Sequence, residues 1–146
     1  MNFEKINISS NRVLDENLFF FLLDLEVKRA RRYQNFICLI SIRLNDISRK
    51  SKLTNLRVHQ KNLSDFLSSE IRESDIIASI GEDRVLLLLP YADVKTGQKA
   101  KQRVEEAIKY LDFKKNGIEI TLDQFCFPIN GADSMDLIKR FLGPKS

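Results

Sequence analysis

Two charged side chains near the middle of the chain, an arginine and an aspartate three residues apart, are of types that could bind a polar or charged ligand. Arg72 and Asp75 lie between an apolar-periodic segment that ends at Ile71 and a branched segment that begins at Ile76. Arginine presents a planar fork of N–H donors, and aspartate offers two oxygens that accept hydrogen bonds. The same two residues could instead form a simple ion pair at the end of a helix, so both interpretations stay open.

The rest of the composition argues against several other kinds of chemistry. His59 is the single histidine of the 146 residues, so we expect no multi-histidine metal site and no bound cofactor. Cys38 and Cys126 lie far apart in apolar segments without a C-x-x-C pattern, and we expect buried thiols. The longest apolar run, Leu18 to Leu23, is far shorter than the ~20 residues of a membrane span. With no signal-peptide pattern at its start, the sequence predicts a cytoplasmic protein.

Charge and hydrophobicity are those of one globular domain. The chain is 43% hydrophobic and 30% charged, with a net charge of +4 that does not by itself indicate nucleic-acid binding. A polar, basic segment runs from Arg43 to Lys61 and could follow nucleic-acid phosphates. It lacks interleaved aromatic residues, so we interpret it as a solvated basic face.

Hydrophobic periodicity and turn residues predict an α+β fold with a central mixed sheet, a β-hairpin and surrounding helices. Asp15 and Asp93 are the expected N-caps of two of these helices. The expected helices cover 11–33, a segment through 63–71, 93–111 and 133–141; the expected strands cover 36–42, 76–80, 85–89 and 117–127, the last as one long strand or a pair.

The first predicted helix carries more apolar residues than one stripe needs, and they divide into two faces. One face serves the core of the domain, and we expect the other to bind a second copy or a protein partner, although the whole helix could also be buried. The two faces are Leu14, Leu18, Phe21, Leu22 and Leu25, and, as the expected interface, Phe19, Phe20, Leu23 and Val27 with Ala30.

The predicted hairpin resembles the signature hairpin of the GGDEF family, the diguanylate cyclases. Residues 71–85, followed by four leucines and Pro90, carry this resemblance. The segment 26–33 before a strand, and 121–134 before the last helix, are similar to other parts of the family's domain. The resemblance implies a GGDEF or palm-like domain over residues 14–142, after an N-terminal extension over 1–13.

The chain departs from the family at the turn of the hairpin. The family has two glycines, an acidic residue, a glutamate and an aromatic residue, whereas this chain has Gly81, Glu82, Asp83, Arg84 and Val85. Glu82 adds a side chain and a negative charge where backbone should approach a triphosphate. Asp83 keeps an acidic metal-ligand position, while Arg84 replaces the glutamate used in the chemistry.

Further departures fall on the metal and base positions that the resemblance implies. The family's metal-holding aspartate aligns with Arg43, and the second aspartate of that motif aligns with Asn45. Arginine repels Mg²⁺ and cannot be deprotonated. The guanine-reading positions fall near Ser51 and Arg57. We therefore expect no cyclase activity and no bound metal: the two arginines could build a new polar site, but we expect them to neutralise leftover carboxylates in a degenerate cleft.

One functional motif of the family is retained. An Arg-x-x-Asp motif, five residues before the glycines, is the family's inhibitory site for its product cyclic di-GMP, and Arg72 and Asp75 have that spacing. The leading hypothesis is thus a non-catalytic cyclic di-GMP receptor, in which a further cation could come from Lys28 to Arg32. The alternatives are a protein-interaction module that keeps only the fold, and a basic nucleic-acid-associated protein.

Overall fold

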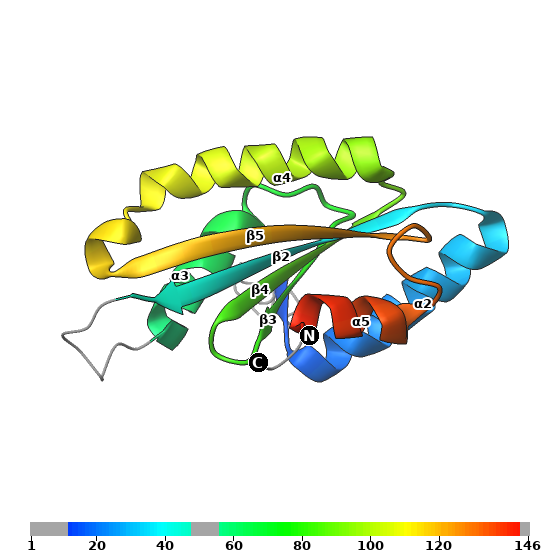
Figure 1. Cartoon of the computed structure of the whole chain (residues 1–146), viewed down its shortest axis with the longest axis horizontal. Coiled ribbons are helices and arrows are strands. Elements are labelled where there is room, and N and C mark those ends of the chain that lie inside the picture. Colours follow the sequence, from blue (N-terminus) through cyan, green and yellow to red (C-terminus); the bar gives the residue numbers. More distant parts are fainter. Residues whose placement is uncertain (1–11, 48–55, 144–146) are drawn as a thin grey trace, which may run out of the picture.

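The computed structural model describes residues 12–47 and 56–143, and the elements within them form one sheet covered by helices on both faces (Figure 1). The strands are arranged in the order β1-β3-β4-β2-β5. The elements are β1 Val13–Leu14, α2 Glu16–Tyr33, β2 Ile37–Asp46, α3 Leu56–Ser68, β3 Ile76–Ile80, β4 Arg84–Pro90, α4 Val94–Ile108, the short 3-10 helices η2 Lys109–Leu111 and η3 Lys114–Asn116, β5 Ile118–Phe127 and α5 Ser134–Leu142.

The alternation of side chains along β2 divides the core into two layers. Ile40 and Ile42 point to the face that α3 and α4 cover, whereas Ile37 and Leu39 point to the face that α2 and α5 cover. Figure 1 shows α4 on one side of the sheet and α2 with α5 on the other. Because helices cover both faces of the sheet over β2, residues Ile37 to Ile42 are buried on both sides and need a largely apolar sequence. The predicted α+β architecture is confirmed.

The predicted hairpin is present, and β3 and β4 pair antiparallel from Ile76 opposite Leu88 to Ile80 opposite Arg84. Strand β1 was not predicted, because its two residues are too few to show a period. It pairs parallel to β3, with Val13 opposite Ile77. The first helix therefore begins at Glu16 instead of residue 11, with the predicted Asp15 as its N-cap.

The prediction for the faces of α2 is wrong. Phe19, Leu23 and Val27, expected at an interface, are at most 1% exposed and belong to the core below the sheet, with Phe20 partly buried against them. The outward residues are Leu18, Phe21 and Leu25, which are 45%, 61% and 43% exposed. Periodicity separates two faces of a helix but does not say which face meets the sheet.

The prediction of separate buried thiols is also wrong, because Cys38 and Cys126 form a disulfide. The two residues lie directly opposite each other in the β2–β5 ladder, and their Cα atoms are 4.2 Å apart. The disulfide lies under α4, where a Cβ on Gly97 would be only 2.7 Å from the Cys38 sulfur.

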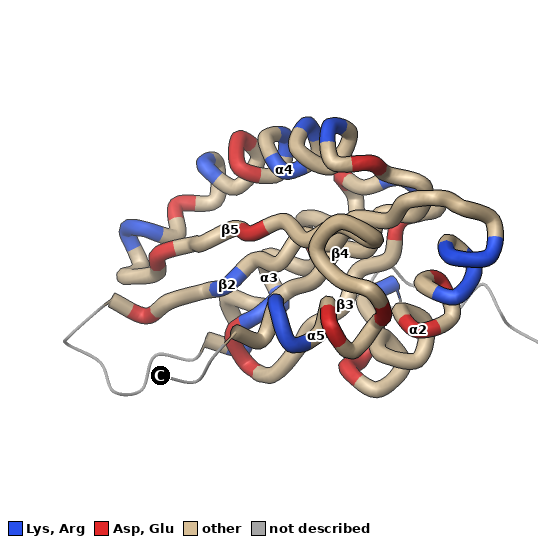
Figure 2. Tube along the Cα trace, turned by 45° about the vertical axis from the view of Figure 1, so that its right-hand side comes forward, with Lys and Arg blue, Asp and Glu red and all other residues tan. Residues whose placement is uncertain are grey.

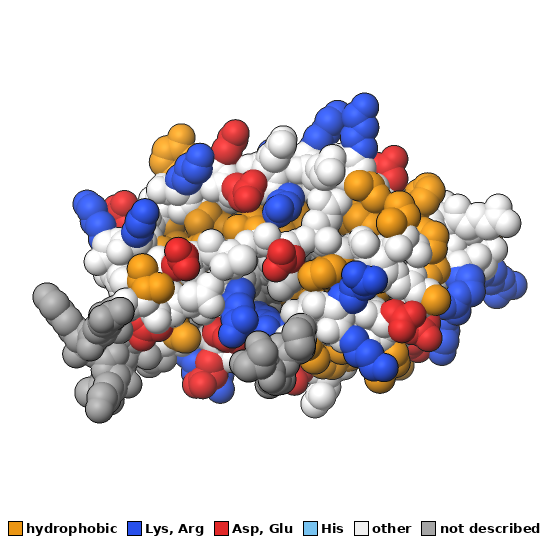
Figure 3. Space-filling model, in the orientation of Figure 1, with side chains coloured by type: hydrophobic (Ala, Val, Ile, Leu, Met, Phe, Trp, Pro, Cys, Tyr) orange, Lys and Arg blue, Asp and Glu red, His pale blue; other side chains and the backbone are white. Residues whose placement is uncertain are grey.

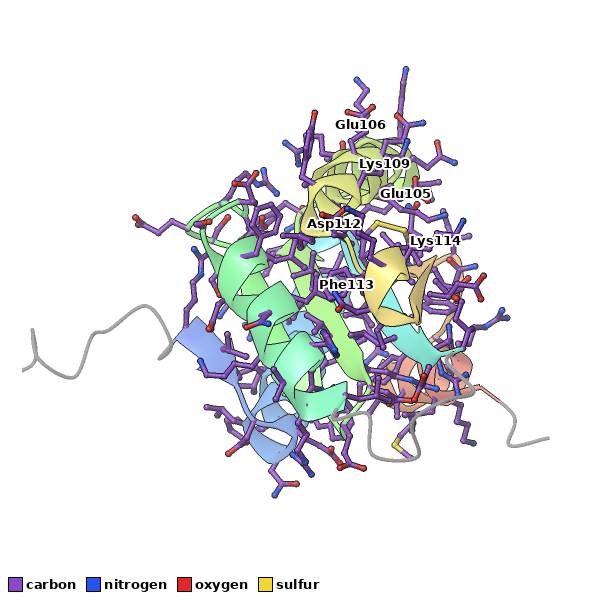
Figure 4. The ribbon with its side chains drawn as sticks, turned by 90° about the vertical axis from the view of Figure 1, so that its left-hand side faces the viewer. Glu105, Glu106, Lys109, Asp112, Phe113 and Lys114 are labelled. Atoms are coloured by element: carbon purple, nitrogen blue, oxygen red, sulfur yellow. A yellow bond between two sulfur atoms is a disulfide. The ribbon has the colours of Figure 1, made fainter. Side chains whose placement is uncertain are left out.

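The end of α4 and the turns after it close the core layer between the sheet and helices α3 and α4. Figure 4 shows Phe113 pointing into the molecule between η3 and α3, and its side chain is buried. Its ring meets the ring of His59 edge to face, with centroids 6.1 Å apart, so His59 takes part in packing.

Within the two described ranges, no helix is both long and apolar enough to cross a membrane.

Candidate functional site

Arg72 and Asp75 form a compact turn between the end of α3 and the start of β3. The Arg72 amide donates to Asp75 Oδ2 (3.0 Å), the Asp75 amide donates to the Arg72 carbonyl (3.0 Å), and Arg72 Nη2 lies 3.3 Å from Asp75 Oδ1. The Asp75 side chain is 3% exposed, whereas that of Arg72 is 55% exposed. The carboxylate is thus fixed inside the turn, and the guanidinium presents its free edge to solvent.

Arg12, which was not identified from the sequence, binds the backbone of this turn through its side chain. Its guanidinium donates to the carbonyls of Ser68 (3.0 Å), Arg72 and Asp75 (3.2 Å). Arg12 reaches them because β1 follows it directly and pairs beside β3. The only sequence signal would have been the strand β1, which is too short to predict.

A groove runs from this turn to the neighbouring helix α4. Two cations, Lys99 and Arg103, line it opposite Arg72, and Figure 2 shows basic positions along α4. The full polar lining is Arg72, Asp75, Thr96, Lys99, Gln102, Arg103 and Glu106, with Leu89 and Ala100. A smaller apolar pocket continues beneath it along Leu67, Ile71, Leu87 and Val104. The Lys28–Arg32 cluster, considered above as a cation source, does not line this groove.

The hairpin turn lies at the other end of β3 and has its charges paired within the chain. Arg43 Nε lies 3.6 Å from Asp83 Oδ2, and Arg57 Nε lies 3.1 Å from Glu82 Oε1. The Gly81 amide donates to a carboxylate oxygen of Glu16 on α2 (3.1 Å). An acidic side chain of the protein therefore already occupies the backbone donor at this glycine.

Arg84 has a different role from the one expected. Its guanidinium donates to the carbonyls of Phe141 (2.6 Å) and Leu142 (3.2 Å) at the end of α5. The last carbonyls of a helix lack partners within the helix, so Arg84 caps α5 rather than neutralising a carboxylate. Behind the turn, the Gln60 side-chain amide donates to the carbonyls of Gly81 (3.2 Å) and Arg84 (2.8 Å).

The residues at this end of the hairpin do not fit a divalent cation. Mg²⁺ requires an octahedron of oxygen ligands, but Asp83 is paired with Arg43, and the Asn45 amide donates to Thr121 Oγ1 (2.9 Å). Within the described parts of the chain, no group of three His, Cys, Asp or Glu residues could hold a metal. Ser51, with Arg49, Lys50 and Lys52 of the basic segment, lies outside the described residues.

The face in Figure 3 gives little support to a nucleic-acid surface, since basic side chains are interspersed with acidic ones over most of it. A backbone-binding surface needs cations gathered along one track. Lys61, at the end of the basic segment, is itself paired with Asp65 at 2.8 Å.

Comparisons with known proteins identify the fold of this mixed-sheet α+β domain. No family model and no curated protein matches the sequence. A DGC protein from Thermotoga maritima is 20% identical, with a TM-score of 0.70 over 92% of this chain and 95% of that one. The GGDEF domain of FimX from Pseudomonas aeruginosa is 18% identical, with a TM-score of 0.69 over 89% and 85%.

A third structure is the GGDEF domain of DgcB from Caulobacter crescentus in complex with c-di-GMP. It is 10% identical to this chain, with a TM-score of 0.65 over 88% of this chain and 78% of that one. The chain has the fold of GGDEF domains.

Proposed function

We propose that this chain is a non-catalytic GGDEF-like protein that binds cyclic di-GMP at the turn formed by Arg72 and Asp75. The observation that carries the proposal is the different exposure of the two side chains in that turn. The Asp75 carboxylate is buried and held by the Arg72 amide, while the Arg72 guanidinium stays half exposed at the edge of a groove. Such a turn presents donors to a ligand without having to order a flexible loop.

The groove offers the cations that a ligand with two phosphates needs. Lys99 and Arg103 line it from α4, on the side opposite Arg72. We propose them, in place of the Lys28–Arg32 cluster, as the further cations of the site. A protein with this fold, the Caulobacter crescentus domain, was solved in complex with the same nucleotide.

The lack of catalysis is part of the proposal, and the hairpin turn supports it. At the positions that the resemblance gives to metal and chemistry, Arg43 pairs with Asp83 and Arg84 caps α5. Glu82, in place of a glycine, adds a carboxylate beside the Gly81 amide, which already binds Glu16. These charges disfavour both a magnesium ion and a triphosphate.

Calorimetry with cyclic di-GMP tests the receptor function. Replacing Arg72 with alanine removes charge-assisted contacts worth about 1.5–3 kcal/mol, so Arg72→Ala should weaken binding roughly 10- to 150-fold. Asp75→Ala should weaken binding comparably, because the turn loses its internal acceptor. Arg84→Ala, at the other end of the hairpin, is the matched control and should bind as tightly as wild type. Absence of binding heat with wild-type protein, or wild-type affinity in Arg72→Ala, would show that the receptor proposal is wrong.

The alternative is a protein-interaction module, and one observation favours it. Leu18, Phe21 and Leu25 form an exposed apolar stripe on α2, and such a stripe often marks an interaction surface. A thermal-shift measurement separates the two functions. Ligand at 100 times its Kd adds about 2.7 kcal/mol of stability to a receptor, whereas a pure interaction module shows no shift with the nucleotide.

A further inference from the structure

We propose that Arg12 is a positioning residue for the Arg72–Asp75 turn. We further propose that it couples ligand binding at this turn to the docking of strand β1 on β3. This inference rests on the proposed function, since it concerns the same site. Arg12 does not line the groove, so it would act through the backbone of the turn and not by touching the nucleotide. No other described side chain donates to the carbonyls of both Arg72 and Asp75.

The first step of the argument concerns what the Arg12 contacts fix. Ser68 is the last residue of α3, and its carbonyl has no partner of its own within the helix. Arg72 and Asp75 are the two ends of the turn. One rigid, always charged guanidinium therefore joins the end of the helix to both ends of the turn. Without it, the Ser68 and Asp75 carbonyls would lose this donor and the Arg72 carbonyl would keep only the Asp75 amide, so the turn would have more conformations to lose on binding.

The second step concerns the segment to which Arg12 belongs. Arg12 directly precedes β1, which docks on β3 through only two residue pairs, Val13 with Ile77 and Leu14 with Ala78. A two-residue strand at the edge of a sheet belongs to the least stable part of a fold. Val13 and Leu14 also pack against the core, and the Arg12 contacts add to this docking only while the turn keeps its shape.

The third step is thermodynamic. If ligand binding stabilises the turn, it must also stabilise the docked state of Arg12 and β1, and docking must strengthen ligand binding by the same factor. The turn would thus transmit occupancy of the site to Arg12 and strand β1 at the edge of the sheet. This gives the receptor an output that does not require chemistry at the hairpin.

The test combines affinity with hydrogen exchange in the whole chain. Calorimetry with cyclic di-GMP compares wild type, Arg12→Ala, Arg12→Lys and the matched control Arg84→Ala, which also removes a guanidinium from helix-terminal carbonyls but far from the groove. We expect Arg12→Ala to weaken binding about 5- to 30-fold, Arg12→Lys to recover part of the loss, and the control to stay within about twofold. We also expect the ligand to slow amide exchange at Val13 and Leu14 in wild type but not in Arg12→Ala.

A purely structural role for Arg12 would lower stability without ligand-dependent protection at Val13 and Leu14, and that result overturns the coupling. Wild-type affinity in Arg12→Ala overturns it as well. If Arg12→Ala does not fold, Arg12→Lys decides the matter by the same two measurements. A wild-type protein that binds no cyclic di-GMP instead overturns the proposed function and this coupling together, so the two failures are distinguishable.

Discussion

Arg43 and Asp83 form an ion pair across the end of the hairpin, with Arg43 Nε 3.6 Å from Asp83 Oδ2. The side chains are 52% and 35% exposed, so the pair contributes little to stability. Its consequence is for the charge at the hairpin turn, because Asp83, a metal-binding position of the GGDEF resemblance that stays acidic in this chain, is engaged by a cation of the chain. This pair leads to the first prediction.

Purified protein incubated with GTP and Mg²⁺ should produce no cyclic di-GMP, as measured by chromatography. The double variant Arg43→Asp with Arg84→Glu should also remain inactive, because Glu82 keeps its carboxylate and its ion pair with Arg57 beside the turn. Turnover by the wild-type protein would contradict the expected lack of catalysis and the roles that we assign to Arg43 and Arg84 at the hairpin turn.

The second prediction uses two leucines on opposite faces of α2. Leu23 is 0% exposed and Leu25 is 43% exposed. Leu23→Ala should lower the free energy of unfolding by about 2–5 kcal/mol, because it leaves a cavity in the core. Leu25→Ala should change it by less than about 0.5 kcal/mol. Urea denaturation measures both, and equal losses would mean that α2 presents a different face to the sheet.

The elements themselves were largely predictable from the sequence because their signals are local. Asp15 and Asp93 are N-caps, as expected, and each accepts a hydrogen bond from an amide three residues later. The hairpin was recognisable from two apolar runs around Gly81. What could not be predicted depends on pairing between distant segments: β1 beside β3, Cys38 opposite Cys126, and the face of α2 that meets the sheet.

The candidate site shows the same division. The spacing of Arg72 and Asp75 was sufficient to bring them together, because a turn joins residues three apart. Arg12 lies 60 residues before Arg72, and the groove cations lie on another helix, so no local pattern could connect them with the turn. Arg84 was placed correctly at the hairpin, but its partners belong to α5, and Phe141 lies 57 residues later in the sequence.

The disulfide leads to the third prediction. It joins residues separated by 88 positions, so it restricts a large loop of the unfolded chain. Reduction should lower the free energy of unfolding by about 2–4 kcal/mol, measured by denaturant titration with and without reductant. The variant Cys38→Ala with Cys126→Ala is the control and should not respond to reductant. Two titratable thiols in the unreduced native protein would contradict the pairing.

The fourth prediction concerns Asp24, which links α2 to α5. It accepts a hydrogen bond from Ser134 Oγ (2.8 Å) and lies 2.9 Å from Lys28 Nζ. The bond from Lys28 and then that from Ser134 hold the pKa of the Asp24 carboxyl below its usual range. Because the folded-state pKa is lowered, this contribution to stability is present above about pH 4 and is lost as the pH falls through the folded-state pKa.

Urea unfolding at a series of pH values tests this linkage. Wild type should be more stable than Asp24→Asn at neutral pH, and the difference should shrink as the solution becomes acidic. Asp93→Asn is a useful comparison, since the amide of Thr96 lowers the pKa of that carboxyl in the same way at the start of α4. A difference that stays constant with pH, or an Asp24 carboxyl that titrates at its ordinary value by NMR, would refute the prediction.

The last prediction concerns the cations that α4 contributes to the groove. Lys99 and Arg103 line it, whereas the exposed Lys95 on the same helix does not. Cyclic di-GMP carries two phosphate charges, and a charge-assisted contact contributes about 1.5–3 kcal/mol, so Arg103→Ala should weaken binding at least 10-fold. Lys95→Ala removes the same charge from an exposed residue that does not line the groove, so it should leave affinity within about twofold, since salt screens exposed charges that make no direct contact. Affinity should fall with added salt in wild type and fall less steeply in Arg103→Ala, because one cation fewer faces the phosphates. Calorimetry at two salt concentrations measures both effects; equal losses in Arg103→Ala and Lys95→Ala would mean that net charge, and not the groove, attracts the nucleotide.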